Sequence, residues 1–226
     1  GTFGAERSWR LRAEQRGDLL SLSVKGKSAH GSTPELGENA VTRLFSLLGA
    51  LNAEDPLFEL CRKLAELLED TRGERLGIAV RDDLSGELSC NLGLLSCKEG
   101  KLILTFDIRH PVTAEPSEIL KGMEQSLAPL GFTTETIKQA PPVHVPADSE
   151  LVRTLQRVYE RETGEKASLL AIGGGTYAKS MPNIVAFGPI FPGDPHVIHQ
   201  ANERSSVSRL MESIRITAAA MHELAG

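Results

Sequence analysis

The chain has 226 residues, of which 40% are hydrophobic and 24% are charged, and this composition is typical of a globular protein. Its net charge is −5 and it contains no basic run, so nucleic acid is not an expected partner. No apolar segment has the length of a membrane span, so we expect no membrane insertion. Cys61, Cys90 and Cys97 form no Cys-x-x-Cys motif, which indicates reduced thiols in or near the core and predicts a cytoplasmic protein.

Residues 1–140 alternate between predicted strands and predicted helices. Strands are indicated where apolar and polar residues alternate, and helices where apolar residues recur every three to four positions. Such strands favour an antiparallel sheet with helices on one face. In chain order we expect a strand at 19–25, helices at 39–52 and 57–69, a hairpin of strands 88–95 and 101–109 with a turn at Gly100, a helix at 116–127 and a strand at 132–139.

A proline-rich stretch, APPVHVPADSE at residues 140–150, marks a domain boundary. After it we expect a helix at 149–164, a short apolar strand that runs into three glycines, a second strand in NIVAFGPIFPG, and a helix at 206–224. Strand, glycine loop, strand and helix in this order are typical of an α/β domain. We therefore predict an α/β fold with two domains, residues 1–140 and residues 141–226.

Two side chains of the first domain are candidates for a functional site. His30 lies in GKSAHGSTPELGENA, a polar loop between a predicted strand and a predicted helix, and loops on rigid scaffolds often carry function. Arg109 ends a predicted strand in FDIRHP, on the face opposite to the apolar residues. A guanidinium placed there can bind a carboxylate through two hydrogen bonds. The alternatives are a loop histidine without a task and an exposed pair of Asp107 with Arg109.

Two segments of the second domain are also candidates. IGGGTYAK places Gly174, Gly175 and Thr176 after an apolar strand, where N–H groups and a hydroxyl can bind an anion. Its spacing is neither that of a Walker loop nor that of a dinucleotide site. GPIFPGDPHVIHQANER contains His196 and His199, and its prolines make the region irregular, so a single metal ligand is expected at most. The alternatives are a tight turn and two loop histidines.

Taken together, these segments resemble a family of dinuclear zinc peptidases that includes carnosinase, glutamate carboxypeptidases and acetylornithine deacetylase. The likeness is greatest to the dipeptidase V branch of bacterial Xaa-His dipeptidases. GKSAHGSTPELGENA resembles the lid motif of the family, and NLGLLSCKEGKLILTFDIRHP resembles its lid hairpin. AIGGGTYAKSMPNIVAFGPIFPG, followed by HQANE, resembles its C-terminal catalytic segment. The resemblance covers nearly all of the chain and implies a zinc-dependent dipeptidase.

The resemblance implies roles for individual residues. His30 matches the lid histidine that stabilises the oxyanion of the tetrahedral intermediate. Arg109 matches the arginine that holds the C-terminal carboxylate of the substrate, and the glycine loop at 174–176 matches the segment that lines the same pocket. His199 matches the last metal ligand of the family.

The chain lacks several motifs of this family. These are a His-x-Asp ligand motif, a bridging Asp, a further acidic ligand, and a Glu-Glu pair whose Glu is the general base acting on metal-bound water. We therefore expect residues 1–140 to be most of a lid domain and residues 141–226 to be the C-terminal part of a catalytic domain in a longer protein. That protein would hold two zinc ions, or another divalent metal, and the isolated chain would be inactive.

Two other functions are consistent with the sequence. A deacylase of the same family, such as a desuccinylase, would share these motifs, although GGGTYA and FPGDPH favour a dipeptidase. A non-catalytic lid or dimerisation module would fold and self-associate without metal, because a sheet edge can pair with a second copy. The expected partners are therefore a dipeptide substrate, the missing N-terminal half of the catalytic domain, and a second copy joined through the lid.

Overall fold

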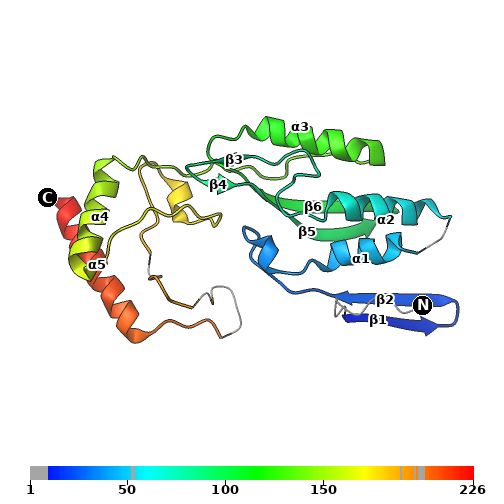
Figure 1. Ribbon diagram of the computed structural model, residues 1–226, viewed down its shortest axis with the longest axis horizontal. Coiled ribbons are helices and arrows are strands. Elements are labelled where there is room, and N and C mark those ends of the chain that lie inside the picture. The colour runs from blue at the N-terminus through cyan, green and yellow to red at the C-terminus, as the bar shows by residue number, and fades with distance from the viewer. Residues whose placement is uncertain (1–9, 52–53, 189, 196, 198–201) are drawn as a thin grey trace. The chain divides into compact units, whose positions relative to one another are not determined.

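The computed structural model describes residues 10–51, 54–188, 190–195, 197 and 202–226. The chain divides into two compact units, one that reaches Lys138 and one that begins at Gln139 (Figure 1). Each unit has an apolar core of its own. Their roles as a lid and as part of a catalytic domain stay predictions.

The first unit consists of antiparallel ribbons and three α-helices, which confirms the predicted mixed α/β class. Its described strands are antiparallel, as predicted, and they pair in three two-stranded ribbons. The strand that pairs with residues 19–25 is rich in charge and was not predicted. The elements are β1 (Arg10–Arg16), β2 (Leu19–Lys25), η1 (Pro34–Leu36), α1 (Ala40–Gly49), α2 (Pro56–Leu67), β3 (Arg81–Asp82), β4 (Gly86–Glu87), β5 (Ser89–Lys98), β6 (Lys101–Arg109), α3 (Pro116–Leu127) and η2 (Ala128–Leu130).

The β5–β6 hairpin forms as predicted, and its turn explains its register. Glu99 and Gly100 both have positive φ, 52° and 75°, which suits a two-residue hairpin turn. From there the ladder runs to the pairing of Ser89 with Arg109. Along β6 the side chains alternate, and Asp107 and Arg109 lie on the face opposite to the core. The residues of β6 that pack on the core are Leu102, Leu104, Phe106 and Ile108.

One apolar core joins this hairpin to all three α-helices of the unit. Helices α1 and α2 lie side by side (Figure 1). Each begins at a side-chain cap: Asn39 accepts from the backbone N–H of Val41 at 2.9 Å, and Asp55 from that of Leu57 at 2.7 Å. The buried residues of this core are Phe45, Cys61, Leu64, Leu68, Leu76, Ile78, Leu88, Cys90, Leu92, Ile119, Met123 and Leu127.

Asp82, at the end of β3, joins two loops of the first unit. Its Oδ1 accepts from the N–H of Leu84 at 3.0 Å and from the hydroxyl of Ser85 at 2.9 Å, and its Oδ2 accepts from the hydroxyl of Thr113 at 3.0 Å. The Ser85 hydroxyl also accepts from the N–H of Val112 at 2.9 Å. Burial opposes ionisation, but the hydrogen bonds from Ser85 and Thr113 outweigh it and hold the pKa of Asp82 well below its usual value.

The second unit is built on two packed helices, α4 (Glu150–Thr163) and α5 (Val207–Ala225), with a short helix η3 (Tyr177–Ser180) between them in sequence. Both long helices match their predicted positions. Ser149 caps α4, and Gly164 ends it with a left-handed φ of 73°. The buried residues of this core are Leu155, Val158, Phe191, Ile216 and Ala220.

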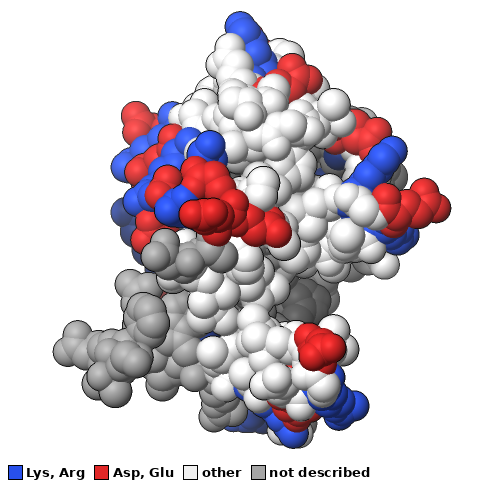
Figure 2. Space-filling view, turned by 90° about the vertical axis from the view of Figure 1, so that its right-hand side faces the viewer, with Lys and Arg blue, Asp and Glu red and all other residues white. Residues whose placement is uncertain are grey.

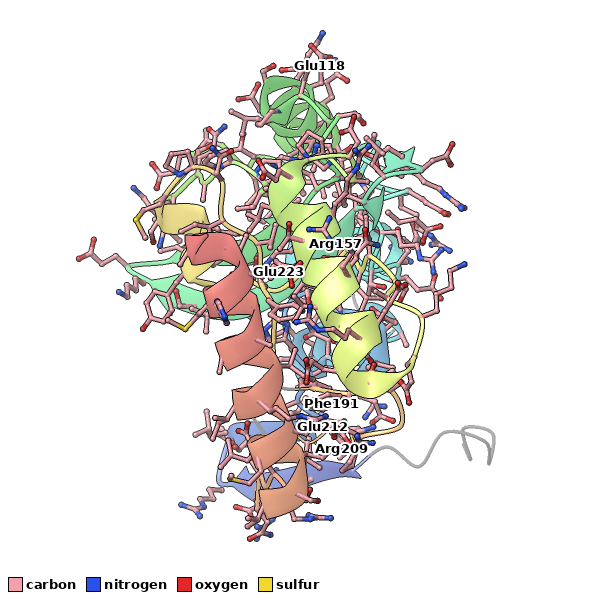
Figure 3. The ribbon with its side chains drawn as sticks, turned by 90° about the vertical axis from the view of Figure 1, so that its left-hand side faces the viewer. Glu118, Arg157, Phe191, Arg209, Glu212 and Glu223 are labelled. Carbon is pink, nitrogen blue, oxygen red and sulfur yellow. The ribbon has the colours of Figure 1, made fainter. Side chains whose placement is uncertain are left out.

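Charged side chains connect the parts of the second unit (Figure 3). Arg157 of α4 contacts Glu223 of α5 at 3.4 Å. Arg209 of α5 lies over the ring of Phe191, with 4.8 Å between its guanidinium carbon and the ring centroid, and it pairs with Glu212 at 2.8 Å. The segment around Phe191 is therefore held against α5 by stacking as well as by burial.

Three predicted strands are not found among the described residues. These are the strand at 132–139, the apolar segment before the triple glycine, and the segment that begins at Asn183. A strand requires a neighbour that accepts and donates its backbone hydrogen bonds, and no described segment pairs with these three. Apolar side chains of the first two segments are exposed, as Ile137 at 78% and Leu170 at 82% illustrate, whereas the third segment contributes Phe191 to the core.

On the face shown in Figure 2, charged side chains of both signs gather in groups that are separated by a large uncharged area. On α2 they follow helical spacing, since Glu59 contacts both Arg62 and Lys63. Exposed pairs of this kind contribute about 0–1 kcal/mol each, so the stability of the fold depends mainly on its cores. No helix in the described part of the chain combines the length and the apolar character needed to cross a membrane.

Alanine substitutions on α2 test the core of the first unit. We expect Leu64→Ala to lower the free energy of unfolding by about 2–5 kcal/mol, because its side chain is fully buried. The matched control is Leu57→Ala on the same helix, whose side chain is 52% exposed. Its expected effect lies within about 0.5 kcal/mol. Urea unfolding measures both variants, and equal losses would contradict the assigned core.

The hydrogen bonds of Asp82 predict a pH dependence of stability. Because its pKa is lower in the folded than in the unfolded state, its stabilisation is fully present above the unfolded value of about 3.9. The stabilisation is lost as the pH falls from there through the folded value. Asp82→Asn should therefore be less stable than the wild type at pH 7 and show a flatter decline below about pH 4.

Unfolding midpoints measured between pH 3 and pH 7 check this expectation. Asp83→Asn serves as the control, since its side chain is exposed and lies next in the sequence. A wild-type slope in Asp82→Asn would show that the hydrogen bonds of Asp82 do not depress its pKa.

Candidate functional site

His30 lies in the loop at 26–39, which connects β2 to α1. Two backbone hydrogen bonds between Lys27 and Glu38, at 2.9 and 2.8 Å, close the base of this loop. Nδ1 of His30 accepts from the backbone N–H of Ser32 at 3.2 Å and lies 2.7 Å from the hydroxyl of the same residue. Because Nδ1 accepts a hydrogen bond, the neutral ring carries its proton on Nε2, which becomes the donor nitrogen.

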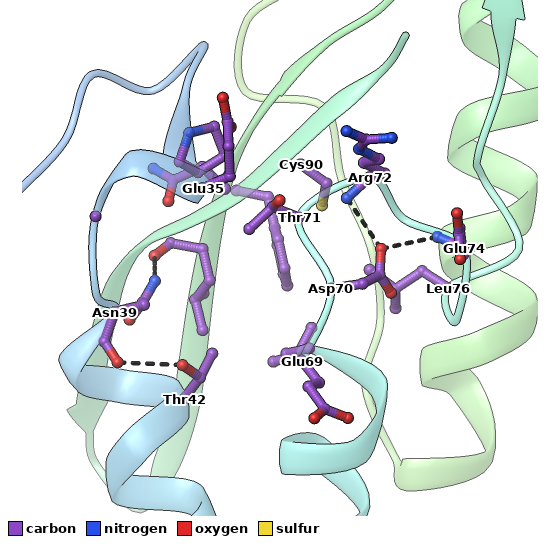
Figure 4. A pocket seen from close by; sticks show the side chains of 16 residues that line it. Glu35, Asn39, Thr42, Glu69, Asp70, Thr71, Arg72, Glu74, Leu76 and Cys90 are labelled. Atoms are coloured by element: carbon purple, nitrogen blue, oxygen red, sulfur yellow. Dashed lines mark hydrogen bonds between the residues drawn. The ribbon is translucent and has the colours of Figure 1, made fainter. Parts of the chain in front are cut away.

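Asn39 attaches the end of this loop to the hairpin (Figure 4). Its Oδ1 caps α1 through the N–H of Val41, while its Nδ2 donates to the carbonyl of Leu92 at 2.7 Å. The Thr42 hydroxyl donates to the Asn39 carbonyl at 3.1 Å. Leu92 lies at a bulge of β5, where the pairing with β6 shifts before Leu94. A single side chain therefore connects the loop, the start of α1 and β5.

The middle of the loop lies against β6. A Cβ on Gly31 would lie 2.4 Å from Oδ2 of Asp107, so only glycine allows this close approach. Asp107 accepts two hydrogen bonds from Arg109, from Nε to Oδ1 at 2.9 Å and from Nη2 to Oδ2 at 2.8 Å. The structure thus brings the loop of His30 and the guanidinium of Arg109 together around one carboxylate.

Arg109 forms the ion pair that was the alternative to a substrate-binding role. The hydrogen bond to Asp107 raises the pKa of Arg109 and outweighs the opposing effect of burial. Two N–H groups of the guanidinium, on Nε and Nη2, donate to the Asp107 carboxylate. The substrate-binding role of Arg109 stays a prediction.

The glycine loop belongs to the second unit and not to that of His30 and Arg109. Thr176 caps η3, because its hydroxyl accepts from the N–H of Ala178 at 3.2 Å. A Cβ on Gly175 would lie 3.6 Å from Nζ of Lys179. Gly174, by contrast, is half-buried. An ammonium group beside the glycine backbone is suited to bind an anion. That this loop binds the substrate carboxylate stays a prediction.

The predicted metal ligand, His199, lies outside the described residues, as does His196. Among the His, Cys, Asp and Glu side chains that the structure describes, no group of three or more is placed to hold a metal ion. A catalytic zinc site takes three protein ligands. The described residues therefore do not form a metal site by themselves.

A pocket of about 540 Å³, which the sequence did not predict, lies beside the end of the His30 loop (Figure 4). Asp70 lines it and accepts from the backbone N–H groups of Arg72, Glu74 and Arg75 at 2.9 to 3.1 Å. Burial opposes ionisation of the Asp70 carboxyl, but these backbone hydrogen bonds outweigh it and lower its pKa. Its carboxylate therefore holds the turn that forms one wall of the pocket.

The cysteines offer no nucleophile to this site. Cys61 and Cys90 are free and buried, as predicted, whereas Cys97 is exposed close to the hairpin turn and not near the core. Burial raises the pKa of Cys90 to about 12, and the negative charge of Asp70 adds to the effect. Burial also raises the pKa of Cys61. Both buried thiols are therefore protonated at neutral pH and unreactive.

Comparison with known proteins identifies the class to which these features belong. Residues 22–223 match the profile of peptidase family M20/M25/M40, so the chain belongs to this family. The match begins within β2 and ends within α5, and therefore includes both units. The predicted peptidase family is confirmed, while the narrower dipeptidase V branch stays a prediction.

Two curated proteins that are similar to the chain are named as dipeptidases. The chain is 40% identical over 215 residues to "Putative dipeptidase YtjP" of Bacillus subtilis (strain 168), which covers 94% of this chain and 46% of that protein. It is 35% identical over 212 residues to the Beta-Ala-Xaa dipeptidase of Lactobacillus delbrueckii subsp. lactis, which covers 92% of this chain and 44% of that protein. The chain thus spans less than half the length of these curated relatives.

Substitutions of Asn39 test the junction between loop, helix and hairpin. We expect Asn39→Ala to lower the free energy of unfolding by about 1–3 kcal/mol, because it removes a helix cap and leaves the Leu92 carbonyl without its donor. Asn39→Ser can still cap α1 but is too short to reach Leu92, so its loss should be smaller. Urea unfolding ranks the variants, and equal losses would show that the bond to Leu92 contributes nothing.

Proposed function

We propose that this chain is part of a metal-dependent peptidase that hydrolyses dipeptides. The observation that carries the proposal is the meeting of the His30 loop with Arg109 around Asp107, in a chain whose family is established. The names of its relatives support dipeptides as the substrate class, and the relative named for β-alanyl dipeptides suggests these as the first substrates to test.

In this proposal the described residues bind and orient the substrate. Nε2 of His30 is the donor that would stabilise the oxyanion formed when water adds to the scissile carbonyl. Arg109 would bind the C-terminal carboxylate through its planar fork. Gly175 and Thr176, with Lys179 beside them, would offer backbone and hydroxyl donors to a carboxylate.

The metal of the proposed enzyme depends on residues beyond those described. Zinc is the proposed ion, with two ions per active site, and when bound it would supply an activated water and polarise the carbonyl. The described side chains do not gather three ligands, so they cannot hold it alone. The sequence also contains no His-x-Asp and no Glu-Glu motif, and on this ground we propose that the isolated chain is inactive.

The second unit exposes apolar side chains, which supports the proposal that this chain is part of a longer protein. Leu170 and Ile172, just before the glycine loop, are 82% and 64% exposed. Helix α5 has a similar stripe at helical spacing, formed by Val207, Leu210, Met211, Ile214, Met221 and Leu224. Such a surface is suited to packing against further polypeptide, which agrees with the greater length of the relatives.

An activity assay tests the proposed function directly. The isolated chain, supplied with zinc, cobalt or manganese, should not hydrolyse β-alanyl or α-dipeptides. The whole protein that contains this sequence should hydrolyse them and lose activity on removal of metal with a chelator. Hydrolysis by the isolated chain would contradict the proposed inactivity, and no hydrolysis by the whole protein would contradict the dipeptidase.

Substitutions in the whole protein test the two binding roles. His30→Ala should lower kcat by about 100- to 1000-fold, the usual loss for one oxyanion donor. His144→Ala is the control, because His144 is exposed in the segment before α4. Arg109→Lys should raise KM for a dipeptide more than for its C-terminal amide, with Arg81→Lys as control. Equal increases in KM for the dipeptide and for its amide would contradict the proposed role of Arg109 in binding the substrate carboxylate.

A further inference from the structure

Asp107 is a strand residue with two unusual neighbours. It lies two positions before Arg109 on β6, so strand periodicity places both side chains on the same face. Oδ1 receives Nε of Arg109 and Oδ2 receives Nη2, at 2.9 and 2.8 Å. This arrangement fixes one edge of a planar, rigid fork, and with it the plane in which the whole guanidinium lies.

The other neighbour of Asp107 is the loop of His30. Oδ2 lies so close to Gly31 that a Cβ there would be 2.4 Å away. This loop is anchored at one end by the Lys27–Glu38 bridge and by Asn39, and its middle rests on the Asp107 carboxylate. The same oxygen therefore contacts the loop of one candidate residue and accepts a hydrogen bond from the other.

We propose that Asp107 is the positioning residue of this site, which sets the geometry between Arg109 and the His30 loop. The inference deepens the proposed function and rests on it for the identity of the bound carboxylate. Asp107 does not touch the substrate in this proposal. It holds the guanidinium plane for the substrate carboxylate and, through Gly31, the distance from that carboxylate to the imidazole.

A purely stabilising role does not explain this geometry. The side chains of Asp107 and Arg109 are 44% and 29% exposed, and partly exposed ion pairs contribute little to stability. At Gly31, a side chain of any other residue would overlap with Oδ2 of Asp107 unless the loop or the carboxylate moved. Orientation of two functional groups does account for both features, because a small misplacement of binding groups strongly lowers the rate of catalysis.

Nuclear magnetic resonance of the full 226-residue chain tests the positioning without requiring activity. The Nε–H signal of Arg109, assigned by its loss in Arg109→Lys, should be visible and protected from exchange with water. Asp107→Ala, which leaves no acceptor for Nε–H at this position, should abolish that protection and shift the amide signals of Gly31 and Ser32. Asp83→Ala, at an exposed carboxylate, should change neither signal.

Two results would overturn the inference. One is an Arg109 Nε–H signal that stays protected in Asp107→Ala, and the other is Gly31 and Ser32 amide signals that do not shift. If Asp107→Ala fails to fold, Gly31→Ala tests the same contact, since its methyl group must displace the loop or the carboxylate. Unchanged Arg109 signals and an unmoved loop in that variant would also contradict the inference.

Kinetics of the whole protein provide the second readout. Asp107→Asn should raise KM about 10-fold or more for a dipeptide and much less for its C-terminal amide, and Asp107→Glu should restore part of the loss. A uniform fall of kcat for both substrates would indicate a merely structural role and contradict the proposal. If the wild type hydrolyses neither substrate, the proposed function fails, while the resonance experiment still decides whether Asp107 positions Arg109.

Discussion

The geometry of the first unit depends on one amide side chain that makes two different hydrogen bonds. Asn39 accepts from the first turn of α1 and donates to the backbone of β5. An alanine could do neither, and a serine could do only the first. Because the donor reaches a bulged position of the hairpin, the loop before α1 is held over the sheet at a defined place. The contact between Gly31 and Asp107 follows from that placement.

The site is therefore organised from the backbone outward. A loop closed at its base and attached at its end presents a histidine whose Nδ1 is already occupied. A strand presents an arginine whose fork is already oriented. Neither side chain belongs to the apolar core, and both obtain their order from hydrogen bonds. Such preorganisation is what an oxyanion donor and a carboxylate fork require.

The sequence predicted much of the first unit because its signals are local. The hairpin turn and the apolar stripes each lie within a few residues, and the structure contains both. The segments around 170 and 184 were predicted as strands from composition alone, but strand formation depends on a partner, which the described residues do not provide. Asp107 was considered only as an ion-pair partner of Arg109, since its contact with Gly31 joins distant parts of the chain.

The turn at Glu99 and Gly100 has a consequence for how this site comes to exist during folding. Pairing within a hairpin forms in about 1–10 μs, long before contacts between distant segments have to be made. A slip of one residue would place Asp107 and Arg109 in the core and Phe106 in solvent, and the chain would then have to unzip nine residues of β6 to recover. Because two successive residues with left-handed φ close the hairpin in one way, the turn determines the register of the two strands. The face on which Arg109 lies is therefore determined by residues at the opposite end of its strand, before the loop of His30 packs against β6.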